Sequence, residues 1–157
     1  MDFIGNVHNK LTNVKLRLQK TYNWSEDFAN LAINEYAKFL YLCSLFPNDH
    51  IIPGKVIDVI WHEHILHTKD YMEFCDEVFK QYLHHEPKDY SKPSDENDKV
   101  LFEKTLDKYK TQYGHTAPKS CWIDDVKKTG TIISANSSSS SNRETIPFDC
   151  RCAPVYK

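Results

Sequence analysis

Histidines are concentrated in one short stretch of the sequence. Three of the eight fall within seven residues, Trp61-His62-Glu63-His64-Ile65-Leu66-His67. Imidazole nitrogens are among the commonest protein ligands for transition-metal ions, and zinc is the default occupant of such sites. This segment, which we call the histidine segment, is therefore the first candidate for a divalent metal site, with His62, His64 and His67 as its predicted ligands.

Helical geometry limits which of these histidines can share an ion. Residues two apart on a regular helix are separated by about 200° around its axis, so His62 and His64 face opposite ways. His64 and His67 are three apart and can converge on one ion. For His62 to join them the helix must unwind near the segment, and the sequence leaves that open.

Further ligands could come from outside the histidine segment. His84 and His85 follow His67 by about 17 residues, roughly 25 Å along a continuous helix, so we do not expect them to share its site. Glu35 and Cys43 are the donors nearest the apolar face of the preceding predicted helix. All four stay as possible additional ligands.

The cysteines offer a second, weaker candidate. Cys150-Arg151-Cys152 resembles half of a thiolate metal site, but no second cysteine pair lies near it in the sequence. We interpret Cys150 and Cys152 as two exposed thiols that could also be additional ligands. Five cysteines, an odd and scattered set, indicate free thiols in a reducing compartment rather than a disulfide framework.

The histidine segment also has a purely structural interpretation. Trp61 and the inward histidine would fill the core, the outward histidine would be solvated, and His67 would face the negative end of its helix. A metal-dependent hydrolase with Glu63 as base is a third interpretation. The HExxH spacing of such enzymes requires a histidine at position 66, where this chain has Leu66. We therefore assign no catalytic residue and do not expect an enzyme.

Charge and composition narrow the classes of partner. A net charge of −2 provides no broad cationic field for nucleic acid or an anionic membrane, so we expect neither partner. Residues 1–6 lack the basic start and apolar run of a signal peptide, and no stretch is long and apolar enough to span a bilayer. We expect an intracellular, cytoplasmic protein.

Apolar residues recur at helical spacing through most of the chain and predict a mainly α fold. Their stripes, with N-cap and stop signals, predict about five helices. These are a helix at about 3–20, one capped by Ser25 that ends before Pro47, one opening at Pro53-Gly54, one capped by Thr68 that stops at Pro87, and one from Ser94 to Gly114. We expect a compact bundle at 1–126 and a flexible, irregular Ser-rich tail at 127–157 that ends in the Cys-x-Cys segment.

A longer pattern surrounds the histidine segment: Trp61-His62-x-His64-Ile65-Leu66, then Thr68, Tyr71, Phe74-Cys75 and His84-His85-x-Pro87. With looser matches on either side, over about three-quarters of the chain, it resembles the glycine-rich domain-containing protein-like family. The resemblance implies a helical domain without a firmly attached catalytic activity. It also implies a glycine-rich C-terminal part, whereas this chain has 4 glycines and a serine run at 137–141.

Two functions compete on this sequence, with the hydrolase as a further alternative. The first is a non-enzymatic helical binding module that holds a transition-metal ion through the histidine segment. The second is a protein interaction module with structural histidines, whose tail contacts an unknown protein partner through Ile146-Pro147-Phe148 or the Cys-x-Cys segment.

Overall fold

Helices dominate the structure, a computed structural model that describes residues 3–87, 91, 96–123 and 150–152. These residues form seven helices and two strands: α1 (Phe3–Lys10), α2 (Thr12–Tyr22), α3 (Glu26–Leu45), α4 (Lys55–Leu66), α5 (Thr68–Phe79), β1 (His85–Pro87), α6 (Glu96–Tyr113), α7 (Lys119–Trp122) and β2 (Cys150–Cys152). The prediction of a mainly α fold is confirmed. The serine run of the predicted tail lies outside the described residues.

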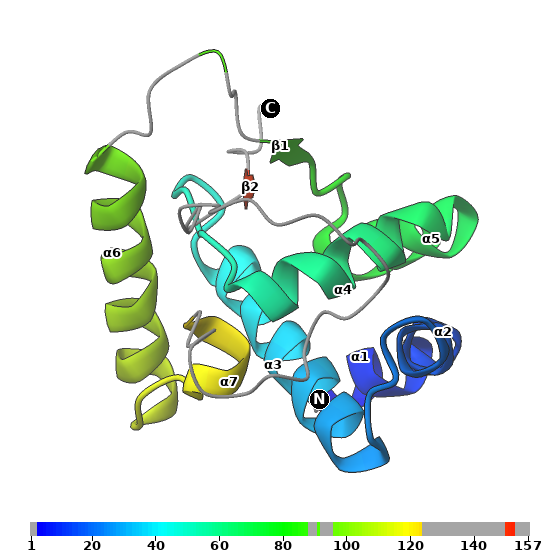
Figure 1. Ribbon diagram of the computed structural model, residues 1–157. Coiled ribbons are helices and arrows are strands. Elements are labelled where there is room, and N and C mark those ends of the chain that lie inside the picture. The colour runs from blue at the N-terminus through cyan, green and yellow to red at the C-terminus, as the bar shows by residue number, and fades with distance from the viewer. Residues whose placement is uncertain (1–2, 88–90, 92–95, 124–149, 153–157) are drawn as a thin grey trace.

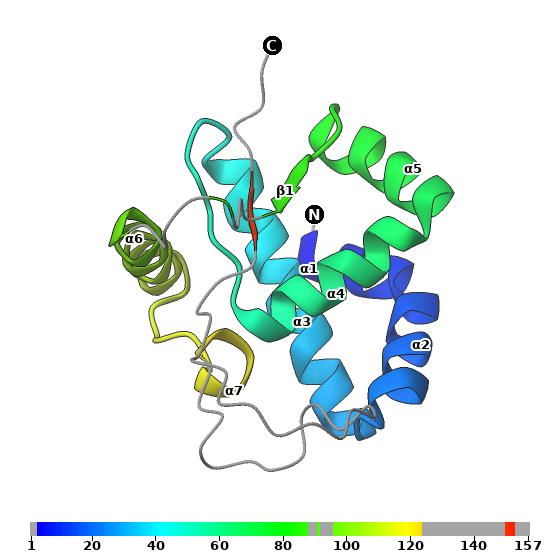
Figure 2. The same cartoon turned by 45° about the horizontal axis from the view of Figure 1, so that its top comes forward.

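The long helix α3 lies at the centre, and the other helices surround it (Figures 1 and 2). It packs against α1, α2 and α4. Its N-terminus is capped as predicted, since Ser25 Oγ accepts a hydrogen bond from Phe28 N at 3.2 Å. Half of its twenty residues are buried, which is typical of a helix that serves as the core for its neighbours.

The predicted first helix is two helices in the structure. The chain turns at Leu11, which has φ −98° and ψ 14°, so α1 ends before it and α2 begins after it. Leu11 is fully buried, as are Val7 and Leu18 on either side. The prediction of one helix was wrong because the apolar spacing continues across a turn whose own side chain also enters the core.

The predicted break between the third and fourth helices is confirmed, but its cap differs. His67 lies between α4 and α5, and its backbone N–H donates to His64 O at 3.1 Å, which closes the last turn of α4. Thr68, predicted as the N-cap, is the first residue of α5. The N-cap position belongs to His67, whose side chain makes no capping hydrogen bond.

The fourth predicted helix ends earlier than expected. Instead of running to Pro87, α5 stops at Phe79, because Lys80 adopts the left-handed conformation with φ 57°. The chain then turns back instead of continuing along α5 (Figure 2), and His85 of β1 contacts Asp58 and the Trp61 ring of α4. The positions of His84 and His85 follow from this early stop.

The C-terminal helices α6 and α7 contact α3, and α7 also contacts α4. Trp122 on α7 is buried. The two strands form one antiparallel pair, with His85 opposite Cys152 and Pro87 opposite Cys150.

None of the helices in the described part of the chain combines the length and apolar character needed to cross a membrane.

Candidate metal centre

Three potential metal ligands converge where α4 meets β1. One ligand atom each from Asp58, His62 and His85 lie within 4.8 Å of one another. His85 Nε2 is 2.9 Å from Asp58 Oδ1, and His62 Nδ1 is 3.7 Å from Asp58 Oδ2. We call these three residues the Asp-His-His triad. A carboxylate and two imidazoles form a donor set that could hold a divalent transition-metal ion.

Helix α4 positions two members of the triad by its own geometry. Asp58 and His62 are four residues apart, so they lie one above the other on the same face of the helix. Asp58 is buried, with its side chain 10% exposed, whereas the side chain of His62 is 51% exposed. The triad therefore has one buried carboxylate and one imidazole at the surface.

A pair of hydrogen bonds holds the third member in place. The indole Nε1 of Trp61 donates to the Tyr71 hydroxyl at 2.9 Å, and that hydroxyl donates to Leu83 O at 2.6 Å. This bridge fastens the segment after α5 to α4, two residues before His85. The His85 ring packs against the Trp61 ring, with centroids 4.1 Å apart, and its side chain is 6% exposed.

Donor spacing in the triad is close to what a small ion requires. Tetrahedral zinc with bonds of about 2.0–2.1 Å to nitrogen and oxygen would set its donors about 3.3 Å apart. The separation of His85 Nε2 from Asp58 Oδ1 is 2.9 Å and that of His62 Nδ1 from Asp58 Oδ2 is 3.7 Å, and one donor atom from each of the three residues lies within 4.8 Å of the others.

His64, predicted as a ligand, lies in the core. Its Nδ1 is 3.0 Å from the Tyr36 hydroxyl, with which it forms a buried hydrogen bond, and its ring packs edge-on against Tyr71 and Phe74. Burial lowers the pKa of His64 to about 3, with a smaller contribution from nearby His67. The imidazole is therefore neutral at physiological pH and serves as a core side chain.

His67 belongs to a different group, centred on Glu63. His67 Nε2 is 3.3 Å from Glu63 Oε1, and Arg17 Nε is 2.6 Å from the same oxygen. Although His67 and Glu63 are at ion-pair distance, their atoms are not aligned for a hydrogen bond. Of the side chains that the structure describes, the triad is the group that meets metal-ligand spacing, so His62 is not brought together with His64 and His67.

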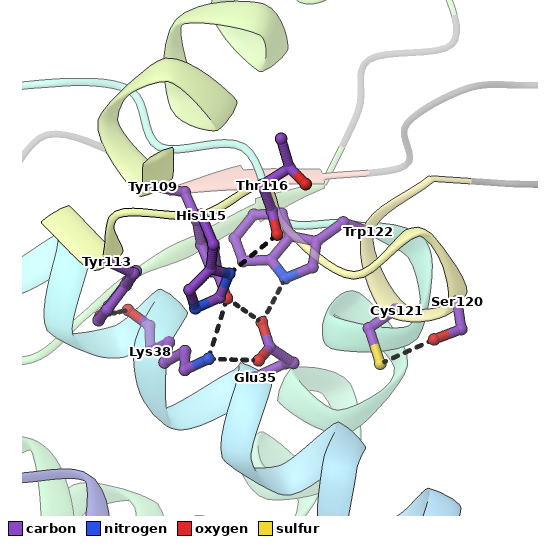
Figure 3. Close-up of polar contacts among 9 residues, drawn as sticks. All are labelled: Glu35, Lys38, Tyr109, Tyr113, His115, Thr116, Ser120, Cys121 and Trp122. Atoms are coloured by element: carbon purple, nitrogen blue, oxygen red, sulfur yellow. Dashed lines mark hydrogen bonds and ion pairs between the residues drawn. The ribbon is translucent and has the colours of Figure 1, made fainter. Parts of the chain in front are cut away.

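Glu35, predicted as a possible additional ligand, is held in a separate buried cluster (Figure 3). Its carboxylate accepts hydrogen bonds from Lys38 Nζ at 2.7 Å, Tyr109 OH at 2.9 Å and Trp122 Nε1 at 2.9 Å. These donors come from α3, α6 and α7, so Glu35 ties the C-terminal helices to the central one. Cys43 is buried on the same helix, α3.

The other possible ligands lie near β1. His84 is exposed, and its ring lies 4.9 Å from that of Tyr82. Cys150 and Cys152 form the ends of β2, so backbone pairing brings both beside the strand that carries His85.

Comparison with known proteins assigns a family. The family model described as UCP032817-like matches residues 4–113. The chain belongs to the UCP032817-like family. No curated protein matches the chain, and no solved structure matches it. The resemblance to the glycine-rich domain-containing protein-like family was wrong, because the matching model belongs to a different family and the motif did not separate the two.

The UCP032817-like match spans the sequence from α1 to the end of α6. It therefore includes all three members of the Asp-His-His triad, while α7 and β2 lie beyond it. The family name states no activity, substrate or ligand. Function has to be argued from the site.

Sequence reasoning missed Asp58 and misplaced His85. Asp58 precedes His62 by four residues on the same helix, and this spacing was the available signal for the pair. The position of His85 depends on the end of α5 at Lys80, where neither glycine nor asparagine marks a left-handed residue. The UCP032817-like chain thus carries a site that local patterns reveal only in part.

Proposed function

We propose that this protein is a helical binding module that holds one divalent transition-metal ion, zinc by preference, through Asp58, His62 and His85. The observation that carries the proposal is the convergence of their three ligand atoms within 4.8 Å. Carboxylate and imidazole together suit zinc, and two histidines with one carboxylate also suit iron(II). The ion would join α4 to the chain segment after α5.

Burial of the ligands favours occupancy by a cation. Asp58 and His85 are largely removed from water, and a buried carboxylate is costly unless its charge is compensated. Without an ion, His85 Nε2–H can donate to Asp58 Oδ1. With an ion, Nε2 presents its lone pair to the metal and the ring proton moves to Nδ1. The hydrogen bond thus holds both side chains near their coordinating positions.

A binding module fits the surroundings better than a hydrolase does. A hydrolase needs a base positioned to act on a metal-bound water. Glu63, the base considered from the sequence, is paired with Arg17 instead.

Elemental analysis of the untagged full-length protein tests this proposal. The wild-type protein should contain about one equivalent of zinc or iron after purification or after exchange with the metal salt. His62→Ala and Asp58→Asn should lose it. His84→Ala is the matched control, because His84 is an exposed histidine that lies outside the triad.

Thermal denaturation supplies an independent readout. A ligand that binds only the folded state raises stability by about 2.7 kcal/mol at 100 times its Kd. Zinc should therefore raise the Tm of the wild-type and His84→Ala proteins and leave the Tm of His62→Ala unchanged. The proposal is overturned if the wild-type protein takes up no metal, or if His62→Ala binds it as well as the wild type does.

A further inference from the structure

A small pocket lies between α5 and the first two helices. Its volume is about 170 Å³, and α1, α2, α4 and α5 each contribute to its lining. Figures 1 and 2 both show α2 and α5 on the same side of α3. A single water needs roughly 10–15 Å³ of such space, so the pocket has room for a molecule of several non-hydrogen atoms. Its lining shares no residue with the Asp-His-His triad.

Helix α5 gives the pocket an acidic wall. Asp70, Glu73 and Glu77 follow one another at intervals of three and four residues, so they lie on one face of the helix, and all three line the pocket. Lys10 of α1 brings a positive charge to the same lining. Three carboxylates and one ammonium leave two negative charges, so the pocket favours a cation over an anion.

The side chain of Lys10 shows which kind of cation this wall accepts. Its ammonium Nζ is 2.5 Å from Glu77 Oε2, which leaves the other two carboxylates to an occupant. Asp70 Oδ2 is 3.9 Å from His67 Nδ1, at the outer limit of an ion pair. Glu73 forms no ion pair within the described part of the chain. Both carboxylates can therefore accept hydrogen bonds from a second ammonium group.

An almost fully buried imidazole also lines the pocket. His64 is 2% exposed, and its Nδ1 is taken by the Tyr36 hydroxyl at 3.0 Å. Among the residues that the structure describes, none forms a hydrogen bond with Nε2. The Tyr36 hydroxyl can accept as well as donate, so the ring proton can lie on Nδ1 and leave the Nε2 lone pair free. Nε2 is then available to an N–H donor in the pocket.

The rest of the lining includes apolar side chains. Val14 and Phe74 are each 3% exposed, and both line the pocket. They would contact the hydrocarbon part of an occupant, while the acidic wall contacts its charge. The acidic and imidazole groups here do not meet metal-ligand spacing in the described part of the chain. Hydrogen bonds of about 2.8 Å reach further than metal bonds of about 2.0–2.1 Å, so an ammonium group suits this spacing better than an ion does.

We propose that this pocket binds a small protonated alkylamine, whose ammonium group donates hydrogen bonds to Asp70, Glu73 and His64 Nε2. Its alkyl chain packs against Val14 and Phe74. The inference is independent of the proposed metal site.

Butylammonium chloride is the probe, and butan-1-ol is its uncharged counterpart. The full-length protein is kept in EDTA at low ionic strength, and NMR spectra follow the side-chain nitrogens of His64 during each titration. Butylammonium should shift the His64 signals to a saturating value, and butan-1-ol at equal concentration should not. Added salt should weaken the binding, because the carboxylates lie at the surface.

Three variants test the role of charge in the pocket. Glu73→Gln should weaken butylammonium binding by about two- to fivefold, the range expected for an exposed charge pair. Lys10→Met should strengthen it by a similar factor, because loss of the Lys10 ammonium releases Glu77. Asp76→Asn is the matched control, since Asp76 is exposed on α5 but lies outside the lining.

Opposite responses of Glu73→Gln and Lys10→Met, with wild-type binding in Asp76→Asn, would support the proposal. It is overturned if butylammonium leaves the His64 signals in place, or if butan-1-ol shifts them equally. Equal weakening in Asp76→Asn and Glu73→Gln would also overturn it, because binding would then reflect a general attraction to the acidic face of α5. None of these results bears on metal binding by the Asp-His-His triad.

Discussion

Asp58 and His85 come from opposite sides of helix α5 in the sequence, yet Asp58 Oδ1 lies 2.9 Å from His85 Nε2. This contact requires the chain to leave α5 at Lys80 and return to α4 within a few residues. The return is fixed by Tyr71, whose hydroxyl joins Trp61 to Leu83 O. The geometry of the candidate metal centre therefore depends on a side chain that does not belong to it.

Tyr71→Phe should weaken both the fold and the site. The substitution leaves the buried Trp61 indole N–H and the Leu83 carbonyl without the hydroxyl that joins them, which typically costs about 1–3 kcal/mol. Urea denaturation should show this loss, and competition with a chelator should show weaker zinc binding because His85 is less well positioned.

Tyr82→Phe is the control for this substitution. Tyr82 is 42% exposed and contacts the Tyr71 ring without taking part in the bridge. Loss of the Tyr82 hydroxyl should leave the free energy of unfolding and the zinc affinity near their wild-type values. Wild-type stability in Tyr71→Phe would show that the bridge does not hold the returning segment.

Most of the helical architecture could be predicted from local sequence, because amphipathic spacing and caps are local signals. Ser25 began α3 as predicted, and the break at His67 was anticipated from the pattern that follows it. The turn at Leu11 was not, since its buried side chain continues the apolar stripe. Local periodicity reports which face is buried but not whether the axis changes direction there.

The candidate site was less predictable, because it depends on contacts between distant residues. His62 was identified from residue type, but Asp58 was not considered as a ligand. His85 was predicted to lie far from the histidine segment, because the helix that contains α5 was expected to continue to Pro87. The pairing of β1 with β2 joins two three-residue strands, which have no detectable alternation, so nothing in the local sequence predicts that Cys152 lies opposite His85.

Removal of the Glu35 carboxylate should be strongly destabilising. Three donors from α3, α6 and α7 point at it, so Glu35→Ala leaves a partly buried ammonium, a buried hydroxyl and a buried indole N–H without their acceptor (Figure 3). Breaking a buried ion pair from one side typically costs about 3–5 kcal/mol. The free energy of unfolding in urea should fall by about that amount.

Glu35→Gln provides a graded comparison. Its single carbonyl oxygen can still accept from Tyr109 and Trp122, which share Oε2, while the amide cannot pair with Lys38 at Oε1. It should therefore lose less stability than Glu35→Ala. Exposed Glu26→Ala should change little. Equal losses in the two Glu35 variants would contradict the assignment of separate acceptors to its two oxygens.

His64 should make the protein less stable in acid. Burial lowers its pKa to about 3, whereas an unfolded histidine titrates near 6.5. Between these values the unfolded chain binds a proton that the native protein does not, so the free energy of unfolding decreases as the pH falls. One such group contributes at most about 1.4 kcal/mol per pH unit.

Urea denaturation in the presence of EDTA, at several pH values from about 7 down to 5, measures this dependence. His64→Gln keeps a similar shape and a hydrogen-bonding group for Tyr36 but does not titrate. Its free energy of unfolding should fall less steeply with decreasing pH than that of the wild type. Parallel slopes would show that His64 binds protons equally in the native and unfolded protein, and so that its pKa is not lowered by folding.

Gly54→Ala tests the close approach of α7 to the start of α4. A Cβ at Gly54 would lie 2.4 Å from Trp122 Cα and 2.6 Å from Cys121 O, and these are backbone atoms that cannot rotate away. The added methyl group must displace α7 and pull the Trp122 indole from Glu35. Overpacking of this kind typically costs about 1–3 kcal/mol. Urea denaturation should show that loss, and the Trp122 indole signal should shift in NMR spectra.

Gly114→Ala separates this clash from a general intolerance of glycine replacement. Gly114 has φ 73°, so alanine is strained there by about 1–2 kcal/mol, but nothing lies within 4 Å of its added Cβ. This variant should lose stability while its Trp122 signal stays in place. A wild-type Trp122 signal in Gly54→Ala would mean that α7 does not approach α4 as closely as the structure shows, and the link from Glu35 to the C-terminal helices would need revision.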